Sequence, residues 1–200
     1  MEPDPKFLRR AAFLDRDGVI NVDRGYVFQR ADFEFVPGVL EAAAQLANDG
    51  FALVVVTNQS GIARGLYSED QFRALTAWMV DSFAAAHAPL AGVYSCPHHP
   101  TEGTGAYRRD CDCRKPAPGL LLRAAHDLNI DLGRSVLFGD KLSDLEAALA
   151  AGVPQRVLLG TDGKFLPGEE AGAGLATARF RSLRDAVRDM SANVRQARHV

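Results

Sequence analysis

The 200-residue sequence is poor in cysteine and contains no long apolar run. It has three cysteines, an odd number, and two of them, Cys111 and Cys113, are separated by a single residue. This is a poor framework for disulfide bonds and suits a reducing compartment. No stretch approaches the roughly 20 apolar residues of a membrane span, and the first residues lack the apolar run of a secretory signal. We therefore expect a cytoplasmic protein that does not contact a membrane.

An excess of charge of either sign is also missing. The sequence has 23 lysines and arginines against 25 aspartates and glutamates, which gives a formal net charge of -2. A protein that binds nucleic acid irrespective of its sequence needs a basic face to neutralise phosphates, so we expect no nucleic-acid partner. A small anionic substrate needs only local positive groups and is compatible with this charge. No exposed apolar patch is evident, so we expect a monomer.

Short apolar runs alternate with helical patterns along the chain. The run at 51–57 is the clearest candidate strand, because it is apolar on both faces and rich in β-branched residues. We expect further strands at 11–14, 92–95, 135–138 and 156–159, and helices at 39–48, 68–87, 120–129 and 142–151. Ser68 and Gln71 have the spacing of a capping box. Strands that alternate with helices predict an α/β fold with a doubly wound, Rossmann-like parallel sheet.

The chain length fits a single domain spanning 1–200, with its core at about 11–160. Glycine and glutamate are frequent at 160–174, which predicts a loop. Apolar residues then recur at helical spacing, at Leu183, Val187, Met190 and Val194. We therefore expect 161–200 to form a loop and a last helix. The interval 17–57 has room for one loop and one helix, and 57–115 is filled by one helix, one strand and a loop with metal-ligand spacing. Neither interval can hold a separate cap domain of about 50 residues or more, so the site should be open.

Two aspartates follow the first expected strand directly, in the segment Asp15-Arg16-Asp17-Gly18. In an extended segment, residues two apart point the same way, so both carboxylates can flank one phosphorus atom. Asp15 can then act as a nucleophile that forms an acyl phosphate, and Asp17 can act as general acid and base. A magnesium ion would neutralise such a site. The same residues are also compatible with a polar turn or a structural calcium site.

Polar residues follow the other expected strands as well. Thr57, Asn58, Gln59 and Ser60 come after the second strand, and Asp140, Lys141 and Asp144 come after the fourth. Arg114 and Lys115 precede the third helix and are suited to stabilising phosphoryl charge. Asp140 can complete a magnesium site, and Asp144 can orient its neighbours from a second layer. Each residue alone fits an ordinary turn or surface charge, but ligands of α/β sheets bind beyond the carboxyl ends of strands, where these segments converge.

The segments 15–18, 57–60, 114–116 and 139–144 together resemble the four motifs of the haloacid dehalogenase superfamily of phosphatases. The resemblance implies that Asp15 is the nucleophile and Asp17 the general acid and base. It implies that Thr57 and Lys115 stabilise the phosphoryl group. It also implies that magnesium is held by Asp15, by Asp140 and by the backbone carbonyl of Asp17.

The segment 96–113 has the spacing of a metal-binding loop. Cys96, His98, Cys111 and Cys113 form the pattern Cys-x-His, twelve residues, Cys-x-Cys. Three thiolates and one imidazole make a closed tetrahedral zinc set, as in structural sites. The twelve intervening residues are polar and glycine-rich and have no hydrophobic core of their own, so a bound metal ion would be needed to hold them in place. His99 is the alternative ligand to His98, but alternate residues face the same way, which favours His98 beside Cys96.

With this loop included, the sequence is similar to the zinc-loop branch of the superfamily, whose members include heptose-bisphosphate phosphatases of surface-polysaccharide synthesis. The resemblance implies a phosphorylated sugar as the substrate. It implies substrate contacts from Asp23, Arg24, Gly25, Tyr26, Thr57, Asn58, Gln59, Ser60, Arg114, Lys115 and Lys141. Arg114 is suited to holding a second phosphate through two hydrogen bonds.

Three other functions remain open from the residues alone. Histidinol-phosphate phosphatase activity occurs on closely similar zinc-loop enzymes, and a nucleic-acid 3'-phosphatase also has Asp-x-Asp-Gly with Thr-Asn-Gln. The absence of a basic stripe counts against the second of these. A non-catalytic phosphate- or zinc-binding module is the third, but such a module has no need of a nucleophile.

Overall fold

Six parallel strands form one sheet in the part of the chain that the computed structural model describes, which is residues 8–160 and 174–197. The strands are β1 (Ala11–Leu14), β2 (Ala52–Asn58), β3 (Leu90–Cys96), β4 (Val136–Gly139), β5 (Gln155–Leu159) and β6 (Ala178–Phe180), in the spatial order β3-β2-β1-β4-β5-β6. Every neighbouring pair is parallel. The predicted α/β class is confirmed.

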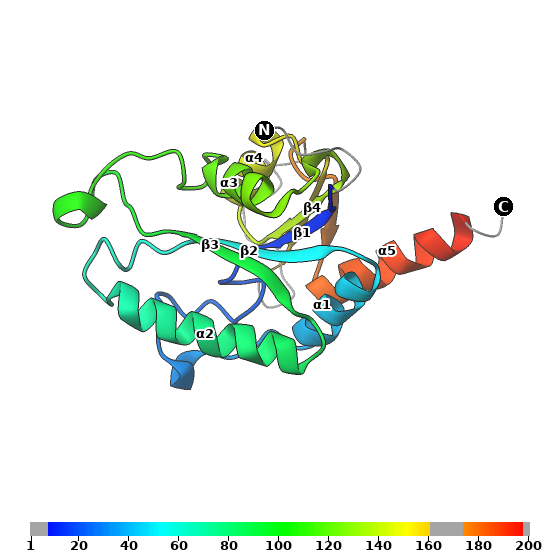
Figure 1. The fold of residues 1–200 in the computed structure, drawn as a ribbon, viewed down its shortest axis with the longest axis horizontal. Helices are drawn as coiled ribbons and strands as arrows, with labels where there is room; N and C mark the ends of the chain where they lie inside the picture. Colours follow the sequence, from blue (N-terminus) through cyan, green and yellow to red (C-terminus); the bar gives the residue numbers. More distant parts are fainter. Residues whose placement is uncertain (1–7, 161–173, 198–200) are drawn as a thin grey trace.

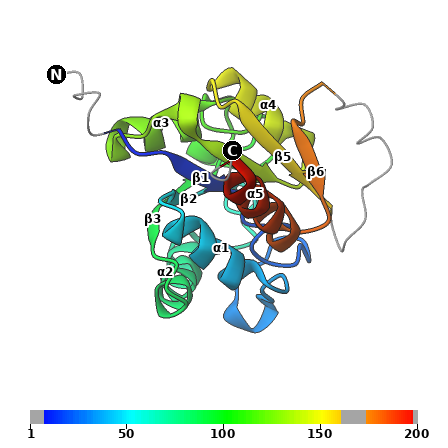
Figure 2. The same ribbon diagram turned by 90° about the vertical axis from the view of Figure 1, so that its right-hand side faces the viewer.

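Helices cover both faces of this sheet (Figures 1 and 2). They are α1 (Val39–Asn48), α2 (Glu69–Ala85), α3 (Gly119–Leu128), α4 (Leu142–Ala150) and α5 (Leu183–Ala197), with short 3-10 turns at Arg30–Asp32, Gly105–Tyr107 and Leu132–Arg134. Side chains of α1, α2 and α5 pack on one face, and side chains of α3 and α4 pack on the other. Both faces are therefore buried, as parallel sheets require.

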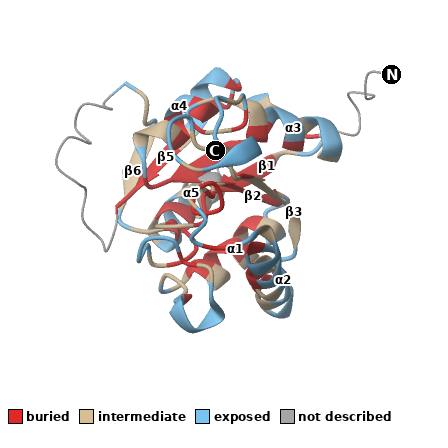
Figure 3. Cartoon of the chain, turned by 90° about the vertical axis from the view of Figure 1, so that its left-hand side faces the viewer, coloured by how far each residue is buried: buried red, intermediate tan, exposed pale blue. Residues whose placement is uncertain are grey.

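The core follows from the alternation of side chains along the central strands. Ala12 and Leu14 of β1 contribute to the cluster with α1, α2 and α5, whereas Ala11 and Phe13 contribute to the cluster with α3 and α4. Figure 3 shows this buried layer running through the middle of the molecule. An apolar residue at every position of a central strand is thus explained by burial on both sides.

The strand order reverses direction between β1 and β4. After β1 the chain builds outward through β2 to β3, and it then returns to place β4 on the other side of β1. Such a switch point leaves a crevice beyond the carboxyl ends of the two strands. Asp15 directly follows β1 and Asp140 directly follows β4, and the amide of Asp15 donates to the carbonyl of Phe138 at 3.0 Å. The topology therefore brings the two aspartates together.

The C-terminal part of the described chain contains one expected element, helix α5, and one unexpected element, strand β6. The expected last helix is present as α5, and its residues Leu183 and Val187 are buried against the sheet. The short strand β6 was not predicted, because its three residues are only partly buried and carry no periodic pattern. Most of the loop expected at 160–174 lies outside the described residues. Among those that are described, no helix is long and apolar enough to cross a membrane.

The predicted capping box at the start of α2 is present and gives a stability test. The hydroxyl of Ser68 accepts from the Gln71 amide at 3.2 Å, and the Gln71 side chain accepts from the Ser68 amide at 2.8 Å. Ser68→Ala should lower the free energy of unfolding by about 1 kcal/mol in chemical denaturation, because an N-terminal amide loses its acceptor. Ser68→Asp keeps an acceptor and should unfold like the wild type; equal stability of both variants would show that the cap contributes nothing.

Candidate active site and metal sites

Three buried carboxylates gather where β1 and β4 end. Asp15 follows β1, Asp140 follows β4, and Asp144 lies in the first turn of α4. One oxygen of each carboxylate lies within 4.8 Å of the others, which is close enough to share a metal ion. The sequence placed these aspartates at separate strand ends, and the structure brings them into one cluster.

Lys115 joins this cluster from a loop 100 residues further along the chain. Its buried Nζ lies 2.8 Å from Asp15 Oδ1, 2.6 Å from Asp144 Oδ1, and 2.8 Å from the carbonyl of Val56, to which it donates. The Asn58 side chain fixes the backbone of Lys115 in turn: its amide donates to the Lys115 carbonyl at 3.0 Å and its carbonyl oxygen accepts from the Lys115 amide at 3.1 Å. Asn58 thus positions the lysine as well as bordering the pocket.

The cluster carries more negative charge than its lysines offset. Burial raises the pKa of Asp15 even though Lys115 opposes the shift. Burial, followed by the charge of Asp15, raises the pKa of Asp140 to about 8. Burial disfavours the ammonium of Lys115, but Asp144 and Asp15 outweigh it and raise the lysine pKa. A divalent cation among these oxygens would let all three carboxylates stay ionised.

The hydrogen bonds distinguish the roles of Asp140 and Asp144. Both oxygens of Asp144 are engaged, Oδ1 by Lys115 and Oδ2 by the Lys141 amide at 3.1 Å. In contrast, Oδ1 of Asp140 is buried without a hydrogen-bond partner among the described residues. An ionised oxygen in that position requires a ligand. The residues therefore fit a magnesium ion held by Asp15 and Asp140, with Asp144 orienting Lys115 from behind.

Asp17 lies apart from this carboxylate cluster. Strand β1 ends at Leu14 and the chain bends at Arg16, so the extended geometry expected for residues 15–17 is wrong. Oδ1 of Asp17 accepts from Arg16 at 2.8 Å and from the side chain of Asn21 at 3.1 Å, and Oδ2 accepts from the side chain of Gln59 at 3.0 Å. These bonds hold the carboxylate at the wall of a neighbouring pocket.

That pocket has a volume of about 310 Å³. It is lined by Asp17, Asp23, Gly25, Tyr26, Asn58, Gln59, Ser60, Tyr67 and Lys141. Lys141 lies 3.2 Å from Asp23, which closes one side with an ion pair. Thr57 is buried beneath it, where its hydroxyl accepts from Gln59 at 2.8 Å. Most of the expected substrate-binding residues therefore share one cavity.

Four of the expected substrate-binding residues do not line this pocket, and they are Arg24, Thr57, Arg114 and Lys115. Arg24 is exposed and pairs with Glu34, at 2.5 Å. Arg114 donates to the carbonyl of His98 at 3.2 Å, within the loop that follows β3. Tyr67, in contrast, is a pocket residue that the sequence did not reveal; its hydroxyl donates to Gln59 at 2.5 Å, and burial raises its pKa to about 12. No local pattern identifies Tyr67, because its contact depends on the fold of the loop after β2.

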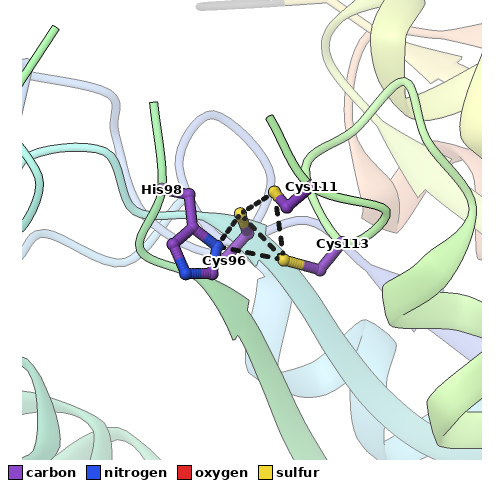
Figure 4. Close-up of side chains that lie close together, drawn as sticks. All are labelled: Cys96, His98, Cys111 and Cys113. Atoms are coloured by element: carbon purple, nitrogen blue, oxygen red, sulfur yellow. Dashed lines mark hydrogen bonds between the residues drawn. The ribbon is translucent and has the colours of Figure 1, made fainter. Parts of the chain in front are cut away.

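The second candidate metal site lies at the end of β3 and in its following loop. Figure 4 shows Cys96, His98, Cys111 and Cys113 converging on one point. The three sulfur–sulfur distances are 3.2, 3.3 and 3.5 Å, and Nδ1 of His98 lies 3.4 and 3.6 Å from Cys113 and Cys96. A zinc tetrahedron with bonds of about 2.3 Å to sulfur has edges of about 3.8 Å, so the four donors are close enough to share a metal ion and would move apart by a few tenths of an ångström to hold zinc.

The protonation states of these four side chains affect whether they can bind a metal ion. Burial, with the hydrogen bond shared between Cys96 and Cys113, raises the pKa of Cys96, and burial together with Arg109 lowers the pKa of His98. A neutral imidazole is already the ligand form, whereas the thiols must lose protons when a cation binds. All three cysteines are free of disulfides. His98, not His99, is the histidine in the cluster, as the alternation of side chains predicted.

Comparison with known proteins agrees with this geometry. A family model described as polynucleotide kinase 3 phosphatase matches residues 11–147, and one described as HAD-hydrolase-like matches residues 112–186. The putative HAD-like phosphatase mll2559 from Mesorhizobium loti is 39% identical with a TM-score of 0.72, covering 80% of this chain and 77% of its own. The fold and the site therefore define a phosphatase of the haloacid dehalogenase superfamily, a phosphoric monoester hydrolase.

More similar relatives narrow the family. D-glycero-beta-D-manno-heptose-1,7-bisphosphate 7-phosphatase of Vibrio cholerae is 54% identical over 88% of this chain and 92% of its own length, and that of Escherichia coli K12 is 53% identical over 82% and 85%. The D,D-heptose 1,7-bisphosphate phosphatase of B. bronchiseptica, complexed with magnesium and phosphate, is 30% identical with a TM-score of 0.77 over 92% of this chain and 99% of its own. The chain belongs to this family of heptose-bisphosphate phosphatases.

Gly18 allows the close packing of the two catalytic strand ends. Its φ is +92°, and a Cβ atom there would lie 2.2 Å from Oδ2 of Asp140. Gly18→Ala should therefore displace the Asp140 carboxylate and raise the magnesium concentration needed for half-maximal activity by at least about tenfold, a cost comparable to one lost ligand contact. Gly152→Ala is the matched control, because Gly152 also has a positive φ but a Cβ atom on it would meet no atom within 4 Å. An unchanged magnesium dependence of Gly18→Ala would contradict the assignment of Asp140.

Proposed function

We propose that this protein removes the 7-phosphate of D-glycero-D-manno-heptose 1,7-bisphosphate through a phosphorylated Asp15. The observation that carries the reaction is the convergence of Asp15, Asp140 and Lys115 in one buried cluster at the switch point of the sheet. The substrate assignment rests on the relatives at 53% and 54% identity, whose activity their names give. The reaction would serve the synthesis of ADP- or GDP-heptose for surface polysaccharides.

In the first step an oxygen of Asp15 attacks phosphorus and the bond to the sugar oxygen breaks. Asp17 supplies the proton that this leaving oxygen needs. The carboxylate of Asp17 lines the substrate pocket, and its hydrogen bonds to Arg16, Asn21 and Gln59 fix its orientation there. The products of this step are the free sugar hydroxyl and the acyl phosphate on Asp15.

In the second step water attacks the phosphorus of the acyl phosphate. Asp17, now ionised, accepts a proton from the water, so the phosphate leaves and the Asp15 carboxylate is restored. Lys115, whose Nζ lies 2.8 Å from Asp15 Oδ1, stabilises the negative charge that builds on the transferred group. Magnesium bound by Asp15 and Asp140 would supply further positive charge and orient the phosphate oxygens; magnesium accompanies phosphate in the B. bronchiseptica relative.

The pocket beside the carboxylates supports a substrate with a polar body larger than phosphate. Lys141 and the hydroxyl of Ser60 offer hydrogen bonds to sugar hydroxyls, whereas the amide groups of Asn58 and Gln59 already bond within the protein and shape the wall of the pocket. Histidinol phosphate, the alternative substrate of similar enzymes, has a cationic body, for which Asp23 in the pocket wall is the matching group. A nucleic-acid 3'-phosphate is less favoured despite the polynucleotide kinase 3 phosphatase match, because the chain has no excess of positive charge.

We further propose that Cys96, His98, Cys111 and Cys113 hold a structural zinc ion. Four protein donors close the coordination sphere and leave no position for substrate. The ion would hold the loop at residues 96–113, here called the zinc loop, against the end of β3. A monomer in the cytoplasm remains the expected state of the protein.

The nucleophile and the substrate can be tested together. Asp15→Asn should lower kcat by several orders of magnitude, because an amide oxygen cannot form the acyl phosphate. Asp32→Asn, at an exposed position, should retain the wild-type rate.

Wild-type kcat/KM should be larger for heptose 1,7-bisphosphate than for fructose 1,6-bisphosphate and histidinol phosphate. Full activity of Asp15→Asn would refute the covalent mechanism, and a preference for histidinol phosphate would refute the substrate assignment.

The zinc site predicts a metal content. Purified protein should contain about one zinc ion per chain by elemental analysis, and Cys111→Ser should contain much less because one thiolate is lost. The zinc loop of that variant should also be cleaved faster by trypsin, which has sites at Arg108 and Arg109. A wild-type protein that is folded, active and free of zinc would contradict the structural assignment.

A further inference from the structure

Three loops meet around the substrate pocket. They are residues 23–28 after β1, residues 59–67 after β2, and the zinc loop after β3. A small apolar cluster lies beneath them, in which Ile62, Tyr67 and Phe72 are buried and Phe28 and Tyr107 pack at the side. The rings of Phe28 and Tyr67 stack with centroids 5.2 Å apart. The loops therefore form one packed unit, in which the position of each depends on the others.

The zinc loop also touches the 59–67 loop through its backbone. The amide of Thr104 donates to the carbonyl of Ala63 at 3.3 Å. Gly103 has a φ of +105°, and a Cβ atom on it would lie 2.3 Å from that same carbonyl oxygen. Only glycine allows this approach. The outer part of the zinc loop is thus seated directly beside Arg64.

Arg64 contacts both of the other loops from this position. Its Nη1 forms an ion pair with Glu102 of the zinc loop, and its guanidinium lies 5.8 Å from the centre of the Tyr26 ring. The Arg64 side chain is 27% exposed and that of Glu102 is 54% exposed, so only the arginine end of the pair is shielded from water. Its Nε is buried without a hydrogen-bond partner among the described residues. None of these contacts involves the reacting carboxylates.

Tyr26 combines an unfavourable backbone conformation with an exposed side chain. Its φ is +52°, which is unfavourable for a residue with a side chain, and 45% of its surface is exposed. It nevertheless lines the pocket, where an aromatic face can pack against the C–H face of a sugar. The guanidinium of Arg64 is the charged group placed on the ring, and an arginine in this position stabilises an aromatic side chain.

We infer that Arg64 is a positioning residue that ties the zinc loop to Tyr26 and so sets the selectivity of the pocket for a sugar body. Arg64 acts through Tyr26 and touches neither the phosphate nor the nucleophile. The zinc loop thereby contributes to selectivity through Glu102, which anchors Arg64 at its other end. The claim that Arg64 affects substrate selectivity rests on the proposed function. The claim that Arg64 links the zinc loop to Tyr26 does not.

Steady-state kinetics test the selectivity. Arg64→Ala should raise KM for heptose 1,7-bisphosphate on the order of tenfold, as loss of a partly desolvated cation–π contact implies. It should leave kcat for acetyl phosphate unchanged, because that leaving group is too small to reach Tyr26. Arg73→Ala is the matched control, since Arg73 is exposed on α2 and forms its ion pairs with Glu69 and Asp70 of the same helix. An equal fall in kcat/KM for heptose 1,7-bisphosphate and for acetyl phosphate, or no fall for either substrate, would refute the role of Arg64 in selectivity.

A double-mutant cycle tests whether Arg64 acts through the ring. In a Tyr26→Ala background, adding Arg64→Ala should change KM for the bisphosphate by less than about twofold, because coupled residues are not additive. Fully additive effects of the two substitutions would refute action through Tyr26.

Hydrogen exchange tests whether Arg64 links the zinc loop to Tyr26, and it needs no sugar substrate. Arg64→Ala should speed amide exchange in residues 23–28 and 99–105, while exchange in β1, β2 and α3 stays at the wild-type rate. Unchanged amide exchange in both loops would show that Arg64 does not link the zinc loop to Tyr26. A wild-type protein inactive on heptose bisphosphate would refute the proposed substrate, and the exchange result would still decide the role of Arg64.

Discussion

The active site depends on one buried ammonium group. Lys115 places a positive charge between Asp15 and Asp144, and this allows carboxylates from two strands and a helix to share a site from which water is largely excluded. Removing one member of a buried ion pair leaves its partner uncompensated. The other contacts of Lys115, with the Val56 carbonyl and the side chain of Asn58, therefore serve the same arrangement by fixing where its charge lies.

The parts of the site that the sequence predicted are those encoded locally. Buried parallel strands read as unbroken apolar runs, and a functional residue directly after such a run must lie at the carboxyl edge of the sheet. This is why Asp15, Thr57 and Asp140 could be placed without coordinates. The cluster of Cys96, His98, Cys111 and Cys113 was likewise found from spacing alone, since two close pairs of residues need only one chain reversal to meet.

The residues that the sequence missed depend on contacts between loops. Tyr67 carries no periodic or motif signal, and the sequence does not reveal that Arg64 contacts His99, 35 positions away in another loop. The bend at Arg16 was missed because a buried arginine that bonds Asp17 and the Val27 carbonyl cannot be distinguished from a surface arginine in sequence. Strand β6 is too short for its side chains to show alternation.

The positions of Cys113 and Lys115 have a consequence for how the enzyme responds to its surroundings. Only Arg114 separates a sulfur-bearing residue of the zinc cluster from the lysine that bonds the nucleophile. A displacement of Cys113 would therefore act within two peptide units of the lysine that bonds Asp15. If the cluster holds a metal ion as proposed, loss of that ion would lower activity by displacing Lys115, although the ion does not contact the substrate.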